Sequence, residues 1–193
     1  EEGVPPGRNL ILQGSEGQAG SVVLPPGSFL DYNHIALLAS VGARRVTVYR
    51  QPRVAILSTG DEVLAIDVQP EPFQIRNSNA HALAVQVIRQ GGVPIVLPVA
   101  PDKLDRTREL IRRGLETDML LLSGGVSAGK YDLVEKVLTE LGAEIHITQV
   151  AIQPGKPLVF ATLGGKPVFG LPGNPISTMV TFEVFVRLAL HRL

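Results

Sequence analysis

The chain contains no cysteine and no tryptophan, and only two of its 193 residues are methionine. The absence of cysteine excludes disulfide bonds, thiol nucleophiles and cysteine-bound metal. Lys and Arg together number 18, as do Asp and Glu, so the formal net charge is +0. A neutral chain without a basic cluster lacks the electrostatic features of a protein that binds nucleic acid or an acidic membrane surface.

Long apolar runs are also missing, although 45% of the residues are hydrophobic. No run approaches the roughly 20 residues that span a bilayer, and no signal peptide pattern is visible. We therefore expect no membrane partner and a cytoplasmic location. With 19% charged residues and a length that can bury a core, the chain is expected to be globular.

From residue 53 onward, short apolar runs alternate with amphipathic segments. Strands are predicted at 54–57, 94–99 and 119–122, and each is followed by a predicted helix. The first helix covers about 80–90 and is capped by Asn77, Ser78 or Asn79. The second is capped by Asp102 and reaches Leu115, and the third covers about 131–141. Apolar runs at 157–162 and 168–171 flank Gly164 and Gly165, which predicts a β-hairpin, and a last helix is expected over about 175–190. The pattern is typical of an α/β domain with a doubly wound, mostly parallel sheet.

Residues 1–52 differ from the rest because proline and glycine interrupt them repeatedly. Short strands are expected at 9–12, 21–24 and 46–49, and a helix is expected from an Asn33 cap through Ala39. We predict two regions: a small α+β remnant of a neighbouring domain and linker at 1–52, and the main α/β domain at 53–193.

A glycine-rich segment at 123–129, Ser-Gly-Gly-Val-Ser-Ala-Gly, directly follows the predicted strand 119–122. Its glycines leave backbone N–H groups accessible, and the next helix directs its positive end at them, which favours a bound anion. Asp132 in the first turn of that helix can hold a metal ion or polarise a water. A tight turn that needs glycine for geometry alone remains an alternative reading.

Three further loops combine polar residues with glycine or proline: Ser-Thr-Gly-Asp-Glu at 58–62, Gln-Pro-Gly-Lys-Pro at 153–157 and Gly-Leu-Pro-Gly-Asn-Pro-Ile-Ser at 170–177. Asn174 fits the N-cap and Pro175 the first position of the last helix, and N–H groups at Gly173 and the helix start are expected to form a second anion site. Each loop alone also fits a simple turn or cap. Ligands of open α/β sheets bind beyond the carboxyl ends of the strands, so we expect all four loops to converge on a phosphorylated ligand with a divalent cation such as magnesium.

In their order, these four motifs resemble those of the molybdopterin molybdenumtransferases, the MoeA family, which includes the E domain of gephyrin. The resemblance extends from about Asn9 to the end of the chain and implies a MogA-like three-layer α/β/α fold. It implies an enzyme of molybdenum cofactor biosynthesis that binds adenylylated molybdopterin and inserts molybdate, with release of AMP, in a Mg2+-dependent step. It also implies a homodimer of a longer protein, possible contact with other proteins of that pathway, and low activity for this central domain alone.

The resemblance also assigns roles to individual residues. Glu62, Asp132 and Asp102 would be catalytic acids, and Glu62 and Asp132 would hold the metal. The substrate-binding residues that it implies are Thr59, Gly60, Asp61, Ser123, Gly124, Gly125, Val126, Ser127, Gly129, Lys156, Pro157, Gly173, Asn174, Pro175 and Ser177. Two alternatives stay open: a MogA-like molybdopterin adenylyltransferase, and a non-catalytic scaffold module that binds molybdopterin.

Overall fold

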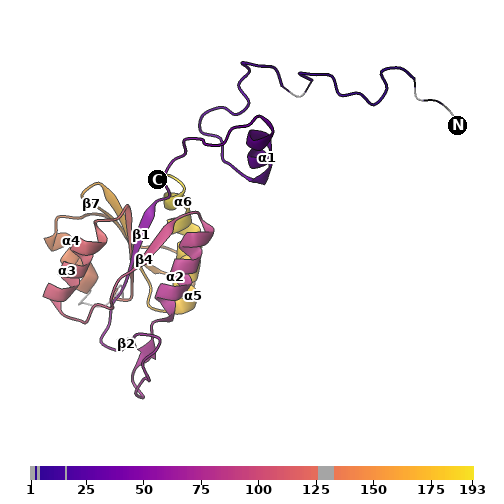
Figure 1. Cartoon of the computed structure of the whole chain (residues 1–193). Coiled ribbons are helices and arrows are strands. Elements are labelled where there is room, and N and C mark those ends of the chain that lie inside the picture. The colour runs from indigo at the N-terminus through magenta and orange to yellow at the C-terminus, as the bar shows by residue number, and fades with distance from the viewer. Residues whose placement is uncertain (1–2, 4, 16, 126–132) are drawn as a thin grey trace. The chain divides into compact units, whose positions relative to one another are not determined.

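The computed structural model describes all residues except 1–2, 4, 16 and 126–132 (Figure 1). The chain divides into two compact units, Glu1–Tyr49 and Arg50–Leu193.

The first unit contains one helix among its described residues, α1 (Tyr32–Ser40). Its N-cap is Asp31 rather than the predicted Asn33, because the Asp31 side chain accepts hydrogen bonds from the backbone N–H groups of Asn33 and His34. The strands predicted at 9–12, 21–24 and 46–49 are wrong, since the described residues there form no strand. Their apolar side chains, such as Ile11 (79% exposed), have no packed surface to cover in this unit.

The second unit is built on a six-stranded sheet in the order β4-β1-β5-β8-β7-β6. The first four strands of that order are parallel, and β7 runs antiparallel to both of its neighbours. The predicted mostly parallel sheet and the hairpin at Gly164 and Gly165 are therefore confirmed. In sequence order the strands are β1 (Arg53–Ser58), β4 (Val93–Val96), β5 (Met119–Ser123), β6 (Glu144–Gln149), β7 (Pro157–Leu163) and β8 (Lys166–Leu171).

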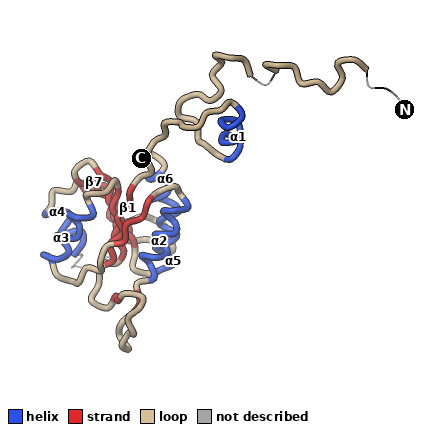
Figure 2. The backbone as a smooth tube through the Cα atoms, in the orientation of Figure 1, coloured by secondary structure: helices blue, strands red, loops and turns tan. Residues whose placement is uncertain are grey.

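Helices cover both faces of this sheet (Figures 1 and 2). On one face lie α3 (Leu104–Gly114) and α4 (Leu133–Glu140). On the other lie α2 (Ser78–Arg89), α5 (Pro175–Thr181), the π-helical segment η1 (Phe182–Val186) and α6 (Arg187–Leu190). The predicted three-layer α/β/α architecture is thus observed.

Strand β1 shows how the sequence forms two cores from one sheet. Successive strand side chains point to opposite faces, so Ala55 and Leu57 pack with α3 and α4, whereas Val54 and Ile56 pack with α2 and η1. All four are 0% exposed. Continuous burial is what a parallel strand covered on both faces requires, and it explains the uninterrupted apolar run in the sequence.

The cap of α2 agrees with prediction, whereas the cap of α3 and the course of the last helix differ from it. Asn77, one of three candidates, caps α2 by accepting a hydrogen bond from Ala80 N at 3.2 Å. Asp102 does not cap α3, whose N-cap is Lys103 without a side-chain bond. The backbone N–H of Asp102 instead donates to Asp61 Oδ1 at 3.0 Å. The last helix is interrupted by η1 rather than regular over 175–190.

A second, two-stranded sheet lies between β1 and α2 in the chain. It pairs β2 (Val63–Leu64) with β3 (Ile75–Arg76) in parallel, and β2 lies beyond one end of the main sheet (Figure 1). The Arg76 guanidinium fixes the intervening loop by donating to Ile66 O and Gln69 Oε1, both at 3.1 Å. Two-residue strands have no detectable sequence period, so this pair was not predicted.

Within the described part of the chain, no helix combines the length and apolar character needed to cross a membrane.

Candidate functional site

A cleft opens where β1 and β5 end, and its cavity volume is about 70 Å³. Ser58 and Ser123, the last residues of these two strands, are register partners. The cleft is lined by segments 58–59, 62–63, 75–79 and 123–124, together with Gly173 and Pro175. Three of the four predicted loops therefore converge at the carboxyl edge of the sheet, where ligands of open α/β folds bind.

The glycine-rich loop needs glycine for two separate reasons at its start. Gly124 (φ +87°) and Gly125 (φ +66°) adopt conformations that other residues rarely take. A Cβ atom would also lie 2.7 Å from Thr59 O if added to Gly124, and 2.7 Å from Thr59 Oγ1 if added to Gly125. The remaining predicted residues of this loop, Val126, Ser127, Gly129 and Asp132, lie outside the described residues.

Thr59 lies beneath this glycine-rich loop and carries a buried hydroxyl. Its backbone N–H donates to Ser123 O at 3.0 Å, and the residue is 2% exposed. Within the described ranges, its Oγ1 atom has no hydrogen-bond partner. Buried polar atoms are nearly always paired, and exceptions call for an explanation such as a bound group. Thr59 was predicted as a substrate-binding residue, and its unpaired hydroxyl at the cleft fits a hydrogen-bonding ligand.

Asn79 contributes to the site in a way that the sequence analysis missed. Its Nδ2 donates to Ser123 Oγ at 2.9 Å, to Gly173 O at 2.8 Å and to Thr178 Oγ1 at 3.3 Å. We considered Asn79 only as a helix cap, a role that belongs to Asn77. The sequence signal that could have identified Asn79 is its position at the start of a helix that begins beside the carboxyl edge of the sheet.

The Gly-Asn-Pro loop is held by its cap. Asn174 Oδ1 accepts from Ile176 N at 3.1 Å and from Ser177 N at 3.3 Å, and Pro175 occupies the first turn of α5. This confirms the predicted cap, which occupies the N–H groups of Ile176 and Ser177, whereas the anion site expected at Gly173 and the helix start stays a prediction. Ser177 is buried and does not line the cleft.

The acidic residues near the cleft form two groups. Asp61 and Asp102 hold the β1 loop and the β4 loop together, since each backbone N–H donates to the other's carboxylate, at 3.0 and 3.5 Å. Glu62 lines the cleft, and its carboxylate folds back over Gly60. A Cβ atom on Gly60 would lie 2.5 Å from Glu62 Oε2. Among the described residues, no group of three His, Asp or Glu side chains is placed to hold a metal.

The Gln-Pro-Gly-Lys-Pro loop lies at the same edge without lining the cleft. Pro157 begins β7, which is antiparallel to β8, so this loop lies level with the carboxyl end of β8. Lys156 is exposed. Gly155 (φ +113°) is buried against Thr181, whose Cγ2 would lie 2.7 Å from an added Cβ. The structure thus places Lys156 and Pro157 near the cleft but not in its wall.

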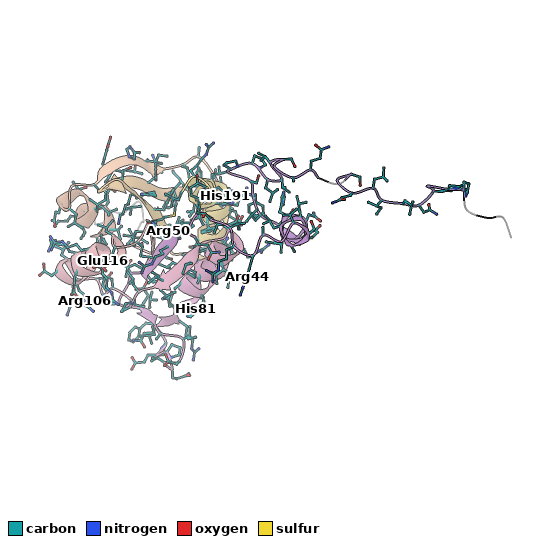
Figure 3. The ribbon with its side chains drawn as sticks, turned by 45° about the horizontal axis from the view of Figure 1, so that its top comes forward. Arg44, Arg50, His81, Arg106, Glu116 and His191 are labelled. Atoms are coloured by element: carbon teal, nitrogen blue, oxygen red, sulfur yellow. The ribbon has the colours of Figure 1, made fainter. Side chains whose placement is uncertain are left out.

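The four histidines lie on or next to different elements of the chain. Figure 3 shows His81 on α2 and His191 just after α6, well apart from each other. The Nε2 atom of His191 bonds to Gln90 Oε1 at 3.0 Å, and that of His146 in β6 bonds to Thr162 Oγ1 at 2.9 Å.

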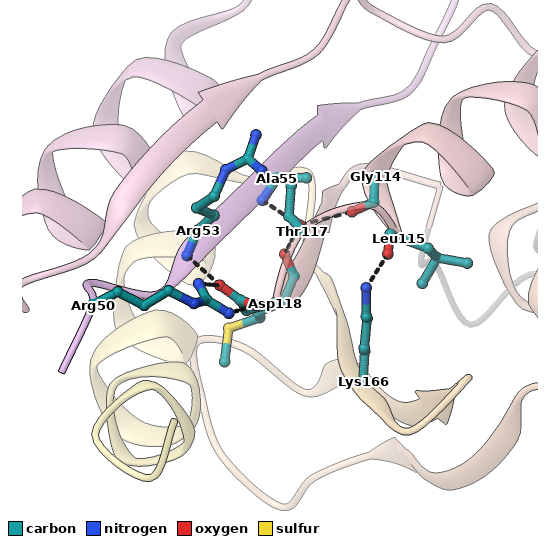
Figure 4. A network of polar contacts seen from close by, with 9 residues as sticks. Arg50, Arg53, Ala55, Gly114, Leu115, Thr117, Asp118 and Lys166 are labelled. Carbon is teal, nitrogen blue, oxygen red and sulfur yellow. Dashed lines mark hydrogen bonds and ion pairs between the residues drawn. The ribbon is translucent and has the colours of Figure 1, made fainter.

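A carboxyl with a strongly lowered pKa, Asp118, lies at the opposite, amino end of the sheet (Figure 4). Asp118 accepts from Arg50 Nη1 and Nη2 at 2.6 and 2.7 Å and from Arg53 N at 2.7 Å. Hydrogen bonding by the Arg50 guanidinium, aided by the Arg53 N–H, lowers the pKa of Asp118 from 3.8 to about 2 against the opposing effect of burial. This pair joins the start of β1 to the start of β5 and has a structural role.

The fold and the cleft place this chain in the class of open, mostly parallel α/β domains, whose ligands bind beyond the carboxyl ends of the strands. Residues 55–192 match the family model described as a probable molybdopterin binding domain, and the chain belongs to that family. The chain is 42% identical over 192 residues to a molybdopterin molybdenumtransferase from Nostoc sp.. The aligned region covers 97% of this chain and 44% of that relative. The chain thus spans less than half the length of the curated relatives that it matches.

Solved structures agree with this family. One structure of a molybdopterin biosynthesis MoeA protein from Pyrococcus horikoshii superimposes with a TM-score of 0.78 at 37% identity, covering 88% of this chain and 42% of that one. A structure of molybdenum cofactor biosynthesis protein B has a TM-score of 0.55 at 16% identity, over 76% of this chain and all of that one. This second similarity shows a common fold alone.

Proposed function

We propose that this chain takes part in molybdenum cofactor biosynthesis by binding adenylylated molybdopterin in the cleft at the carboxyl edge of the sheet. The observation that carries the proposal is the convergence of three polar loops on one cleft, above a buried Thr59 hydroxyl without a partner among the described residues. Membership of a molybdopterin-binding family supports the choice of ligand.

The cleft offers hydrogen-bond donors suited to phosphate oxygens. Ser123 Oγ accepts from Asn79 Nδ2, so the Ser123 hydroxyl hydrogen remains available to a ligand. The Thr59 hydroxyl is a second such donor. Arg76 also lines the cleft, and it uses only two of its five N–H groups in the bonds to Ile66 and Gln69. Together these groups supply positive charge and dipoles to an anionic substrate.

The donor set at the cleft also fits magnesium. Mg2+ keeps several waters and takes one or two carboxylates plus substrate phosphates rather than a complete protein cage. Glu62 in the cleft wall provides one such carboxylate, and we propose Asp132 as the other by its place in the motif. The chemistry that magnesium supplies when bound is neutralisation of charge on the phosphate oxygens.

For the complete protein, we propose the molybdenumtransferase reaction: cleavage of the adenylate with release of AMP, and insertion of molybdate as the second substrate. Glu62, Asp132 and Asp102 are the proposed acids, and Asp102 would act through Asp61, to which it is hydrogen-bonded. A homodimer, other proteins of the pathway and a cytoplasmic location belong to the same proposal. The 42% identity to a molybdenumtransferase favours it over a MogA-like adenylyltransferase.

Product analysis tests this proposal. The complete protein, with magnesium and molybdate, is incubated with adenylylated molybdopterin, and in a parallel reaction with molybdopterin and ATP. Release of AMP in the first reaction, lost in Glu62→Gln, supports the molybdenumtransferase. Release of pyrophosphate in the second supports the adenylyltransferase instead. Binding without either product would identify a non-catalytic module, and no binding would reject the proposed ligand.

A further inference from the structure

We propose that Asn79 is a positioning residue whose single side-chain amide fixes Ser123, where the glycine-rich loop begins, and the Gly-Asn-Pro loop relative to each other. The ligand part of this inference rests on the proposed function, whereas the loop-ordering part does not. Neither loop contains Asn79, which lies at the second position of α2.

The orientation of the Asn79 amide is determined by its partners. Gly173 O, at 2.8 Å, is a carbonyl oxygen and can only accept, so the NH2 group must face it. The same nitrogen lies 2.9 Å from Ser123 Oγ and 3.3 Å from Thr178 Oγ1. Two hydrogens therefore serve three acceptors, which belong to the end of β5, the loop before α5, and α5 itself.

Thr178 extends the contact into the Gly-Asn-Pro loop. It is 0% exposed, and its hydroxyl donates to Pro172 O and to Asn174 O, the latter at 2.9 Å. Since its hydrogen is committed to this loop, Thr178 Oγ1 can only accept from Asn79. Asn79 thus holds the loop directly through Gly173 and indirectly through Thr178.

The two loops that Asn79 joins are close to each other at the cleft. A Cβ atom on Gly173 would lie 3.7 Å from Gly124 Cα, which is ordinary van der Waals contact. Apart from Asn79, a long backbone hydrogen bond from Gly124 N to Leu171 O, at 3.3 Å, also joins the two segments. Loops held by few hydrogen bonds move more freely, and binding groups that move lose affinity because a ligand must then order them. The amide of Asn79 removes this freedom before the ligand arrives.

The matched control is Gln86, on the same helix. Its Nε2 also donates to the last helical segment, to Met179 O at 3.2 Å and to Glu183 Oε1 at 2.9 Å, but Gln86 does not line the cleft. Gln86→Ala and Asn79→Ala each remove an amide that joins α2 to the C-terminal helices. Only Asn79→Ala removes one that holds the cleft loops.

The first measurement is amide hydrogen exchange by NMR on the wild-type protein and both variants, without ligand. Gly124 N, which donates to Leu171 O at 3.3 Å, and Ser177 N, bonded to Asn174, report on the two loops. We expect exchange at both amides to be about tenfold faster in Asn79→Ala, the scale of one or two lost hydrogen bonds. Ala55 in β1 should be unchanged. Equal exchange in Asn79→Ala and Gln86→Ala would overturn the proposal.

The second measurement is calorimetric titration with adenylylated molybdopterin and magnesium. We expect the dissociation constant for this ligand to rise at least tenfold in Asn79→Ala and less than twofold in Gln86→Ala. The two variants are compared where their midpoints of thermal unfolding are the same. Asn79→Asp should also lose affinity, because its carboxylate cannot donate to Gly173 O. This variant tests the same contact if Asn79→Ala is too unstable to titrate. Faster exchange with unchanged affinity would make Asn79 structural only. If the wild-type protein does not bind, the proposed function fails, and the exchange data still decide the role of Asn79 in loop order.

Discussion

The hydroxyl of Thr59 lies so close beneath Gly125 that a Cβ atom there would be 2.7 Å from Thr59 Oγ1. Because β1 and β5 are adjacent and in register, the loop after one packs directly on the loop after the other. The wall of the cleft is formed by this packing, so its shape depends on the absence of side chains at Gly124 and Gly125.

A first prediction concerns Gly124→Ala, compared with Gly142→Ala. Both glycines have positive φ, +87° and +84°, so both variants incur a backbone penalty of about 1–2 kcal/mol. An added Cβ meets Thr59 O at 2.7 Å at position 124 but nothing within 4 Å at position 142. Urea denaturation should therefore show the larger loss of stability for Gly124→Ala. Equal losses would mean that the two loops do not pack as described.

A second prediction separates stability from binding at Thr59. The buried Thr59 hydroxyl has no partner among the described residues, so its removal in Thr59→Val should raise the free energy of unfolding by about 1 kcal/mol. Thr107→Val is the control, because Thr107 is equally buried but its hydroxyl donates to Pro101 O at 3.2 Å, so this variant should be destabilised. Thr59→Val should also weaken ligand binding. A similar loss of stability in both variants would count against an unpaired Thr59 hydroxyl.

A third prediction is a pH dependence from Asp118. The pKa of this carboxyl is lowered from 3.8 to about 2 in the folded protein. Its contribution to stability is therefore present above about pH 4 and is lost as the pH falls through about 2. Asp118→Asn should flatten the stability profile in that window, measured by urea denaturation from pH 5 to 2. Asp67→Asn, at an exposed position, is the control. An unchanged profile in Asp118→Asn would refute the Arg50–Asp118 interaction.

A fourth prediction uses the cap of α5 to distinguish folding from anion binding. Asn174→Ala removes the bonds to Ile176 N and Ser177 N and should lower stability by about 1 kcal/mol. Asn174→Asp keeps the capping oxygen and should retain stability. Its added negative charge beside Gly173 should nevertheless weaken binding of an anionic ligand. Full affinity in Asn174→Asp would indicate that no anion binds near this loop.

The sequence predicted the sheet because its signals were strong and local. The apolar runs at β1 and β5 and the glycines between β7 and β8 each depend on neighbouring residues only, and Asn174-Pro175 matches a cap that a helix can form by itself. The N-terminal strands failed because a strand also needs a partner, which apolar residues such as Ile11 do not specify.

The site was predicted less completely, for a related reason. The motifs identified which loops carry polar residues, and the parallel sheet brought three of them to one cleft. The bonds of Asn79 to Ser123 and Gly173, 44 and 94 positions away, depend on tertiary packing. The two reciprocal hydrogen bonds between Asp61 and Asp102, found in place of the expected Asp102 cap, depend on tertiary packing too.

The central claim, that this cleft binds adenylylated molybdopterin, is tested most directly by calorimetric titration in the presence and absence of magnesium. The proteins compared are the wild type, Glu62→Gln and Glu116→Gln, the last an exposed carboxylate that does not line the cleft. We expect magnesium-dependent binding by the wild type and Glu116→Gln, and a loss of that dependence in Glu62→Gln. Equal, magnesium-independent titrations for all three proteins, or no binding by any of them, would contradict the central claim.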